Sequence, residues 1–252
     1  MKMNVIICGL CGKMGRCLVK LINSSENGKV VAGIDKFPCS EFDFPVFTSL
    51  EETNVKADVI IDFSHPSALS QILNYCEKTK TPAVICTTGF SQEQVKEIKK
   101  ASEKTAIFYS RNMSLGINLI LTLAKKAASF LGNGFDIEIT EKHHNQKIDA
   151  PSGTALMIAE EIKRVKTDGE LIFDRTKRRE KRKPNEIGMH CVRGGSICGD
   201  HEVMFAGENE IITISHHAQS REVFASGAIK AAEFMVGKSA GLYSMEDMLL
   251  AK

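Results

Sequence analysis

The chain has 252 residues, of which 43% are hydrophobic and 25% charged, values close to the soluble globular average that argue against disordered and membrane classes. Its 33 Lys and Arg residues nearly balance 31 Asp and Glu, so the net charge gives no reason to expect nucleic acid as a partner. The apolar stretch LGINLILTLA covers about ten residues, too few to span a bilayer, and no secretory signal opens the chain. We therefore expect a cytoplasmic protein without a membrane partner, in which most of the eight cysteines are reduced.

Strand-like and helix-like segments alternate through residues 1–113. The strand-like runs are NVIICG, KVVAGID, ADVIIDFS, PAVICTTG and AIFYSRNMS, and segments with apolar residues at helical spacing lie between them. This order predicts an α/β fold with a Rossmann-type doubly wound parallel sheet. Because the strands are parallel, their carboxyl ends should meet at one edge of the sheet.

A second α+β domain is expected over residues 114–221. Residues 115–131 have the composition of a buried helix, and FDIEITEKHH alternates apolar and polar residues like a strand with one covered face. A second helix should begin after Ser152, a good N-cap residue, and a hairpin should turn at residues 207–209. The helix-like residues 222–252 are expected to pack back on the first domain.

The stretch CGLCGKMG at residues 8–15 has two incompatible interpretations. As a Cys-x-x-Cys redox or metal pair, it would place Gly12 and Gly15 in a helix, each at a cost of about 1 kcal/mol relative to alanine. As a dinucleotide-binding turn, it uses Gly9 for the tight turn, Gly12 for close approach of a pyrophosphate and Gly15 for helix packing. We favour the second interpretation, which predicts no metal site.

Asp35 supports this choice because it closes the second strand, where a carboxylate can bind a ribose 2′-hydroxyl. Lys36 and Lys13 are able to pair with a 2′-phosphate, so the cofactor is NADH or NADPH. Two further strand ends should reach the same edge, and they carry Thr87 and Thr88 in one case and Asn112 in the other.

The segment EKHHNQKIDAPSGTA concentrates more candidate chemistry than any other. His143 and His144 end a strand, Lys147 follows in a polar loop, and Ser152 opens a helix. A helix start with free N–H groups and a nearby lysine binds carboxylate or phosphate. An imidazole beside such an anion site can deliver a proton near neutral pH.

Other clusters have simpler interpretations. His216 and His217 are interpreted as surface residues, and a zinc site built from the two histidine pairs lacks a ligand spacing typical of zinc. Residues 175–183, RTKRREKRK, suggest nucleic-acid binding by their charge. They include no aromatic side chain for base stacking, so we expect a solvated loop instead.

Several motifs together resemble the dihydrodipicolinate reductase family. They are GLCGKMG, IDFS, TTGF, NMSLGINL, EKHHNQKIDAPSGTA, VRGGSICGDHEVMF and SREVFASGAIKAA, which occur in this order over nearly the whole chain. The resemblance implies a reductase that uses NADH or NADPH to reduce a cyclic dicarboxylate, 4-hydroxy-tetrahydrodipicolinate, in diaminopimelate and lysine biosynthesis. It also implies a homotetramer built through the second domain's sheet.

The resemblance also implies the roles of individual residues. His143 is expected to be the acid/base residue and Lys147 its catalytic partner. Substrate carboxylates are expected to bind at His144, Ser152, Gly153 and Thr154. The expected cofactor contacts are Gly9, Leu10, Cys11, Gly12, Lys13, Met14, Gly15, Asp35, Lys36, Cys86, Thr87, Thr88, Ser110, Arg111, Asn112 and Met113.

The chain departs from the family pattern at Cys11, at Cys86, where glycine is usual, and at Ser110-Arg111. Two alternatives to the family's reaction remain at this point. One is a related two-lobed dehydrogenase acting on aspartate semialdehyde or an amino acid. The other is a protein without enzymatic activity that senses nucleotides or binds nucleic acid.

Overall fold

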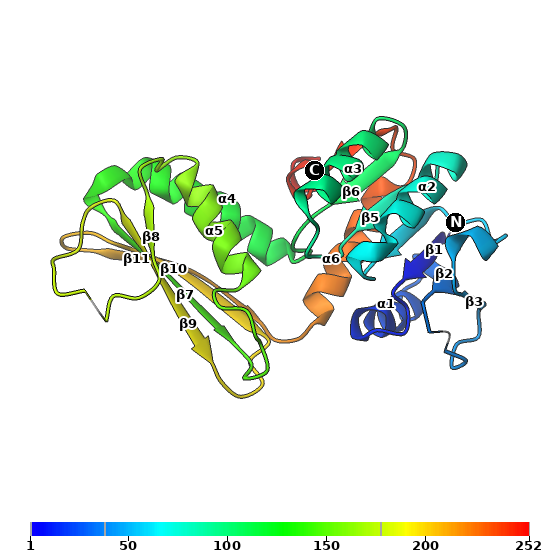
Figure 1. The fold of residues 1–252 in the computed structure, drawn as a ribbon, viewed down its shortest axis with the longest axis horizontal. Coiled ribbons are helices and arrows are strands. Elements are labelled where there is room, and N and C mark those ends of the chain that lie inside the picture. Colours follow the sequence, from blue (N-terminus) through cyan, green and yellow to red (C-terminus); the bar gives the residue numbers. More distant parts are fainter. Residues whose placement is uncertain (1, 38, 177, 252) are drawn as a thin grey trace. The chain divides into compact units, whose positions relative to one another are not determined.

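The computed structural model describes residues 2–37, 39–176 and 178–251. The chain forms two compact units (Figure 1). The first unit contains residues 1–114 and 221–252, and the second contains residues 115–220. The sequence predicts that the first part binds the dinucleotide and that the second binds the substrate and forms the oligomer. These roles remain predictions.

The first unit is built on a parallel sheet, as predicted. The sheet order within the described residues is β12-β6-β5-β4-β1-β2-β3, and every neighbouring pair is parallel. Two short strands at the sheet edges, β3 and β12, were not predicted. The strands are β1 Met3–Cys8, β2 Gly28–Ile34, β3 Val46–Phe47, β4 Val59–Asp62, β5 Ala83–Ile85, β6 Ala106–Tyr109 and β12 Gly241–Tyr243.

Helices cover both faces of this sheet. Helix α1 packs against α6, and α2 packs against α3. A capping box at Ser91 begins α3, where the serine side chain accepts from the Gln94 N–H and the Gln94 side chain accepts from the Ser91 N–H. The helices are α1 Lys13–Asn23, α2 Leu69–Thr79, α3 Gln92–Ser102, α6 Glu222–Met235 and α7 Met245–Leu250, with short 3₁₀ turns at Leu50–Glu52 and Pro66–Ala68.

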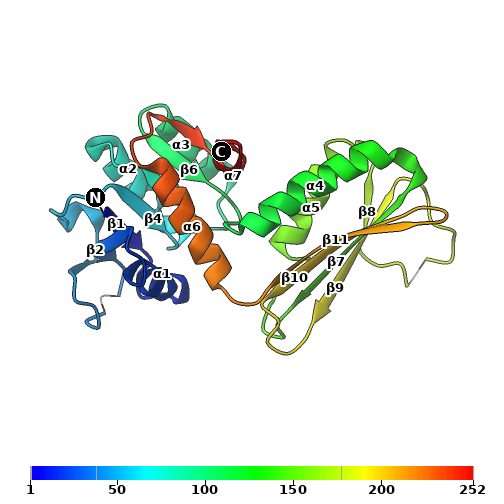
Figure 2. The same ribbon diagram turned by 180° about the vertical axis from the view of Figure 1, so that it is seen from behind.

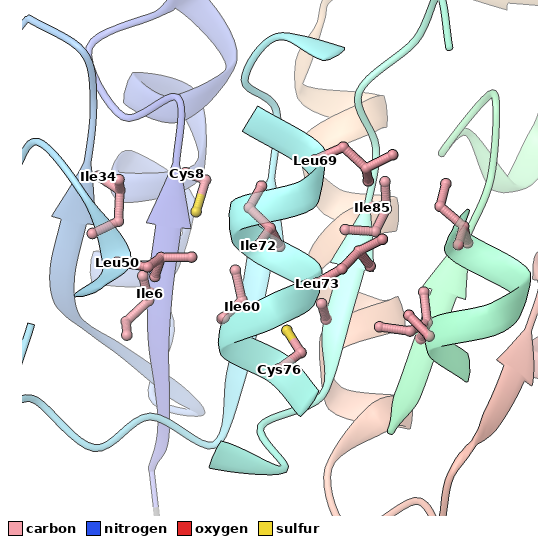
Figure 3. Packing of buried hydrophobic residues seen from close by; sticks show 14 of the residues in the cluster. Ile6, Cys8, Ile34, Leu50, Ile60, Leu69, Ile72, Leu73, Cys76 and Ile85 are labelled. Atoms are coloured by element: carbon pink, nitrogen blue, oxygen red, sulfur yellow. The ribbon is translucent and has the colours of Figure 1, made fainter. Parts of the chain in front are cut away.

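The core on one side of the sheet is aliphatic. Leu69, Ile72, Leu73 and Cys76 of α2 point onto the strands (Figure 3). The strand residues that meet them are Ile6, Cys8, Ile34, Ile60 and Ile85. Because helices cover the other face of the sheet as well, these strands are buried on both sides, which explains their unbroken apolar runs.

The second unit is a mixed sheet with helices on one face, shown from both sides in Figures 1 and 2. The sheet order is β11-β10-β7-β9-β8, with β7 antiparallel to β10 and parallel to β9. Burial alternates along β7, and its inward Ile137 and Ile139 meet helices α4 and α5. The elements are α4 Leu115–Leu131, a 3₁₀ turn Gly132–Gly134, β7 Asp136–His143, α5 Gly153–Lys163, β8 Glu170–Ile172, β9 Glu186–Arg193, β10 Gly199–Ala206 and β11 Ile211–Ala218.

Two local predictions for this unit are confirmed. Ser152 is the N-cap of α5, and its hydroxyl oxygen accepts from the Ala155 N–H at 3.1 Å. The hairpin between β10 and β11 closes with the Gly207 N–H donating to the Glu210 carbonyl at 2.9 Å.

Helix α4 spans residues 115–131 as predicted, and it extends beyond the ten-residue apolar stretch at its start. Together with the following 3₁₀ turn it forms the one helix of the described residues that is long and apolar enough, by length and composition alone, to cross a membrane. Core helices of soluble proteins pass the same test. Here Ile120, Ala124 and Ala128 of α4 belong to the core formed with the sheet and α5.

The close packing of the first turn gives a test of this fold. A methyl group at Gly15 would lie 2.3 Å from the Leu10 carbonyl oxygen and 2.4 Å from the Gly9 carbonyl oxygen. Gly15→Ala should therefore lower the free energy of unfolding by about 1–3 kcal/mol, because backbone atoms must shift. Urea or thermal unfolding measures this loss.

Gly134→Ala is the matched control, because nothing lies within 4 Å of the added methyl group. Equal unfolding midpoints for the two variants would contradict the packing described for the turn.

Candidate active site

The glycine turn between β1 and α1 has the geometry of a nucleotide-binding turn. Gly9 has a φ of +77°, and an added Cβ would lie 2.4 Å from the Phe63 carbonyl oxygen, so only glycine fits there. Gly12 is the extended N-cap of α1 and has no side chain to cover the helix start. This leaves the N–H groups of the helix start available for a phosphate.

Asp35 follows β2 and lies beside this turn. Its Oδ2 accepts from the Cys11 N–H at 2.9 Å, and its Oδ1 accepts from the Phe37 N–H at 3.2 Å. The turn and Asp35 line a cavity of about 690 Å³ in the first unit, together with Lys36. A carboxylate, a lysine and a bare helix start around one cavity are groups that fit a dinucleotide.

The other predicted strand ends lie at the same edge of the sheet. Cys86 follows β5, which is paired with β4 and β6, and its N–H donates to the Asp62 carbonyl at 2.9 Å. Cys86 and Thr87 are buried, whereas Thr88 is exposed. After β6, the Ser110 hydroxyl donates to the Asn112 carbonyl at 2.7 Å and fixes that loop.

The chemistry of the second unit centres on a fully buried carboxylate. Both oxygens of Glu141 accept from the Arg193 guanidinium, at 2.7 and 2.8 Å. The Ser152 N–H donates to Oε1 at 3.1 Å, and Nδ1 of His143 lies 2.6 Å from Oε2. Burial alone would raise the pKa of Glu141, but hydrogen bonds from Arg193, His143 and Cys191 outweigh it and hold that pKa at about 2.

This carboxylate fixes the proton arrangement on His143. An ionised carboxylate only accepts hydrogen bonds, so Nδ1 must be the donor and Nε2 is the nitrogen that gains or loses a proton. Burial lowers the pKa of His143, Glu141 opposes that shift, and the charges of Lys147 and Arg193 add to it. The imidazole is therefore neutral near pH 7 in the free protein.

A glycine keeps space beside the ring. A Cβ at Gly199 would lie 3.0 Å from Nε2 of His143, closer than almost any real contact. Gly199 begins β10, so a side chain at the start of that strand would press on Nε2.

His201 of β10 completes the cluster from the side of Ser152. Its Nε2 lies 3.0 Å from the Ser152 hydroxyl, and its ring packs edge-on against His143 with centroids 5.2 Å apart. Burial, followed by the charge of His143, lowers the pKa of His201 to about 4, so this ring is neutral. His201 thus contacts both the N-cap of α5 and the His143 ring.

The remaining predicted residues follow in the same segment. Lys147 pairs with Asp149 at 2.7 Å, and the Lys147 N–H donates to the His144 carbonyl at 3.1 Å. Gly153 is exposed in the first turn of α5, and Thr154 is partly exposed. The structure thus brings His143 and Ser152 together around Glu141, and Arg193 connects this cluster to the Lys147–Asp149 pair by donating to the Asp149 carbonyl at 2.5 Å.

The basic segment lies in the loop between β8 and β9, as predicted, and several of its described side chains are exposed, but some of its arginines are engaged in ion pairs. Arg182 pairs with Asp136 at 2.7 Å and Glu138 at 3.0 Å, and Arg175 pairs with the buried Glu186. These arginines attach the segment to the sheet of the second unit. Part of the segment's positive charge is therefore used in ion pairs within the chain and does not require nucleic acid. Lys177, which belonged to the same prediction, lies outside the described residues.

Sequence reasoning missed the residues around His143. Glu141 contacts its Nδ1, Arg193 pairs with Glu141, and Gly199 and His201 of β10 lie beside the ring. One signal was available, because Glu141 occupies an inward position of β7 in line with Ile137 and Ile139. A charged residue in such a position requires a buried partner. Which residue supplies the partner depends on the pairing of β7 with β9, which places His143 opposite Arg193.

A Rossmann-type sheet with a nucleotide-binding turn, joined in one chain to a unit with a histidine and carboxylate cluster, defines a two-domain oxidoreductase. Family models for the N-terminal and C-terminal parts of dihydrodipicolinate reductase match residues 3–113 and 116–249. The chain therefore belongs to the dihydrodipicolinate reductase family, whose members are pyridine-nucleotide-dependent reductases.

Individual relatives agree with this membership. The chain is 53% identical to a 4-hydroxy-tetrahydrodipicolinate reductase of Caldanaerobacter subterraneus subsp. tengcongensis, over 99% of both chains. It is 49% identical to the enzyme of the same name from Clostridium novyi, over 98% of both. A dipicolinate-bound dihydrodipicolinate reductase from Paenisporosarcina sp. TG-14 superposes with a TM-score of 0.80 and 29% identity, over 97% of this chain and 98% of that one.

The contact between Glu141 and His143 can be tested without any substrate. Because the Glu141 carboxylate raises the pKa of His143, Glu141→Gln should lower that pKa further, and the imidazole should lose its proton at a lower pH. An NMR titration of the His143 ring measures the change.

Glu138→Gln is the matched control, because Glu138 pairs with His190 at 2.7 Å on the same sheet and should leave the His143 titration unchanged. A His143 pKa that stays constant or rises in Glu141→Gln would refute the electrostatic account.

Proposed function

We propose that the second unit of this chain carries out the proton chemistry in the reduction of 4-hydroxy-tetrahydrodipicolinate, with His143 as the acid and Lys147 as its cationic partner. The observation that carries this proposal is the 2.6 Å contact between Nδ1 of His143 and the ionised Glu141. Because Nδ1 is engaged by Glu141, Nε2 is the ring nitrogen left to exchange a proton with the substrate. Two relatives named 4-hydroxy-tetrahydrodipicolinate reductase support this choice of substrate.

The substrate class follows from the charge of this segment. A cyclic dicarboxylate carries two negative charges, and Lys147, His144 and the start of α5 at Gly153 and Thr154 are groups that bind carboxylates. The hydroxyl and N–H of Ser152 are already engaged by Ala155 and Glu141. Ser152 is therefore proposed to act by holding the helix start in position for the carboxylate.

Substrate binding is proposed to prepare His143 for proton donation. Burial and the charges of Lys147 and Arg193 keep the ring neutral when no anion is present. A dianion beside the ring offsets these cations, so it raises the pKa of His143 and favours protonation at Nε2. Glu141 then stabilises the imidazolium that forms, and the proton at Nε2 is delivered to the substrate.

The cofactor is proposed to be NADH or NADPH, held by residues 9–15, Asp35 and Lys36 in the first unit, and by Cys86–Thr88 and Ser110–Met113. When bound, the reduced nicotinamide supplies a hydride to the substrate. Asp35 favours a ribose with a free 2′-hydroxyl, whereas Lys36 and Lys13 favour a 2′-phosphate. Both cofactors are therefore expected to bind.

We also propose a cytoplasmic homotetramer that has no nucleic-acid or membrane partner. Strand β11 is at an edge of the second sheet and exposes Ile211 to 65% and Ile212 to 36%. An apolar edge of this kind is suited to burial against another copy. The arginine ion pairs of the basic segment favour a structural role for its charge.

The proposed proton donor and its partner are tested by substitution. His143→Gln and Lys147→Met should each lower the single-turnover rate of cofactor oxidation by about 10²–10⁴-fold, the range expected for loss of acid–base catalysis. Binding of NADH and NADPH, measured by fluorescence titration, should stay at the wild-type level.

His217→Gln serves as the control, because His217 has an exposed ring that pairs with Asp200 at 3.2 Å. Wild-type turnover in both His143→Gln and Lys147→Met would show that the roles are wrongly assigned.

Gly199→Ala tests the space beside Nε2. The added methyl group would lie 3.0 Å from that nitrogen, so the ring must move away from its productive position. A shift of the ring by a few tenths of an ångström should lower the rate of proton transfer by less than the roughly 10²-fold that accompanies a misplacement of about 1 Å, while cofactor affinity and melting temperature should change little.

Gly134→Ala, where the methyl group meets nothing within 4 Å, should retain full activity. An unaltered kcat in Gly199→Ala would show that the space beside Nε2 is not needed for proton transfer.

A further inference from the structure

Two cysteines at the nucleotide cavity are joined in a disulfide. Cys11 belongs to the glycine turn and Cys39 lies in the segment that follows β2, with their Cα atoms 6.3 Å apart. The other cysteines are free thiols, and Cys8, Cys76 and Cys86 among them are buried. Both members of the bridge are half-buried rather than buried.

The bridge connects two walls of the cavity. One wall is the turn with Gly9, Cys11 and Gly12, and the other is the segment with Asp35, Lys36 and Phe37. In a nucleotide-binding turn of this kind, the ribose lies between the turn and the acidic residue at the end of the second strand. The disulfide therefore ties together the two groups between which the ribose must fit.

Hydrogen bonds bring the same two walls together. Asp35 accepts from the Cys11 N–H through one oxygen and from the Phe37 N–H through the other. The Cys11 sulfur also lies 3.2 Å from the Phe37 carbonyl oxygen. In the bridged form, the carboxylate expected to bind the ribose is directed at the protein's own backbone.

The position of Cys11 also favours reaction of its thiol. It directly precedes Gly12, the N-cap of the eleven-residue helix α1, where the helix dipole stabilises a thiolate. The Arg16 side chain donates to the Cys11 carbonyl at 3.0 Å and places a cation close by. The Asp35 carboxylate and Glu41, which pairs with Arg16 at 2.6 Å, oppose these effects in part.

We propose that Cys11 and Cys39 form a reversible thiol–disulfide switch that weakens binding of the nicotinamide cofactor when it is oxidised. This inference rests on the proposed function insofar as the cavity is the cofactor site. Reduction releases the segment after β2 from the turn, so the ribose can enter and Asp35 can turn to its hydroxyls. Binding and oxidation are then linked, and bound cofactor should in return protect the two thiols.

The chemistry needs a low-molecular-weight disulfide as oxidant. The thiolate of one cysteine attacks a sulfur of that disulfide, forming a mixed disulfide and releasing one sulfur of the reagent as a thiolate. The second cysteine then attacks the mixed disulfide, forms the Cys11–Cys39 bond and releases the other sulfur. The two cysteines lose two electrons in total, and their two protons pass to the two released thiols.

The experiment compares the full-length protein in two redox states. The oxidant is oxidised lipoamide, a cyclic disulfide that closes again after attack by a single thiol and leaves no stable adduct on a lone cysteine. Peptide mass mapping follows the Cys11–Cys39 link, and fluorescence titration measures the Kd of NADH and NADPH. Oxidised wild-type protein should bind both about tenfold more weakly or worse, and dithiothreitol should restore binding.

Two variants separate the switch from general oxidation. Cys39→Ser should bind both nucleotides like the reduced wild type, before and after oxidant. Cys17→Ser, which removes a free thiol of α1, should switch like the wild type.

The switch would be overturned if the linked protein bound cofactor as tightly as the reduced protein, or if excess oxidant produced no Cys11–Cys39 peptide. A reduced protein that bound neither nucleotide would instead overturn the proposed function, and the switch with it.

Discussion

The second unit depends on the burial of one charged carboxylate. Glu141 is fully buried, and a carboxylate without partners in such a place would cost far more than a fold of this size can tolerate. Arg193 compensates the charge with two hydrogen bonds and the Ser152 N–H adds a third. Removing one member of a buried pair typically costs about 3–5 kcal/mol, so β7, β9 and the start of α5 are held in one arrangement.

The same carboxylate connects stability to chemistry. The interactions that keep Glu141 ionised also make it an obligatory acceptor for Nδ1 of His143. His143 is thereby oriented by a residue that packing already fixes, with Gly199 leaving space at Nε2. A rigid support of this type is what a proton donor needs, because small displacements of a catalytic group cause large losses in rate.

Much of this arrangement was predictable from the sequence. The parallel sheet followed from alternating segments, and the turn at Gly9 and Gly12 followed from the glycine spacing, whereas Gly15 lies inside α1, where close packing accounts for it better than a helix-free turn does. Asp35 was predictable because it ends a strand next to that turn. Each of these inferences uses local patterns, in which the residues that interact are close in the chain or occupy equivalent ends of consecutive strands.

The missing parts depend on contacts between residues distant in the chain. Arg193 meets Glu141 only because β7 pairs with β9 in parallel. The sequence pattern did not predict a strand at the position of β9. His201 arrives on β10 from the opposite side of β7. The pairing of Cys11 with Cys39 was also not predictable, because the position of Cys39 depends on the course of an irregular segment after β2.

The tautomer of His143 tests the central claim most directly. The nitrogen chemical shifts of the ring should be recorded on ¹⁵N-histidine-labelled protein at a pH well above the pKa of His143, where the ring is neutral. The account predicts a proton on Nδ1 and a bare Nε2, because the ionised Glu141 accepts from Nδ1. A neutral ring protonated on Nε2 would contradict it.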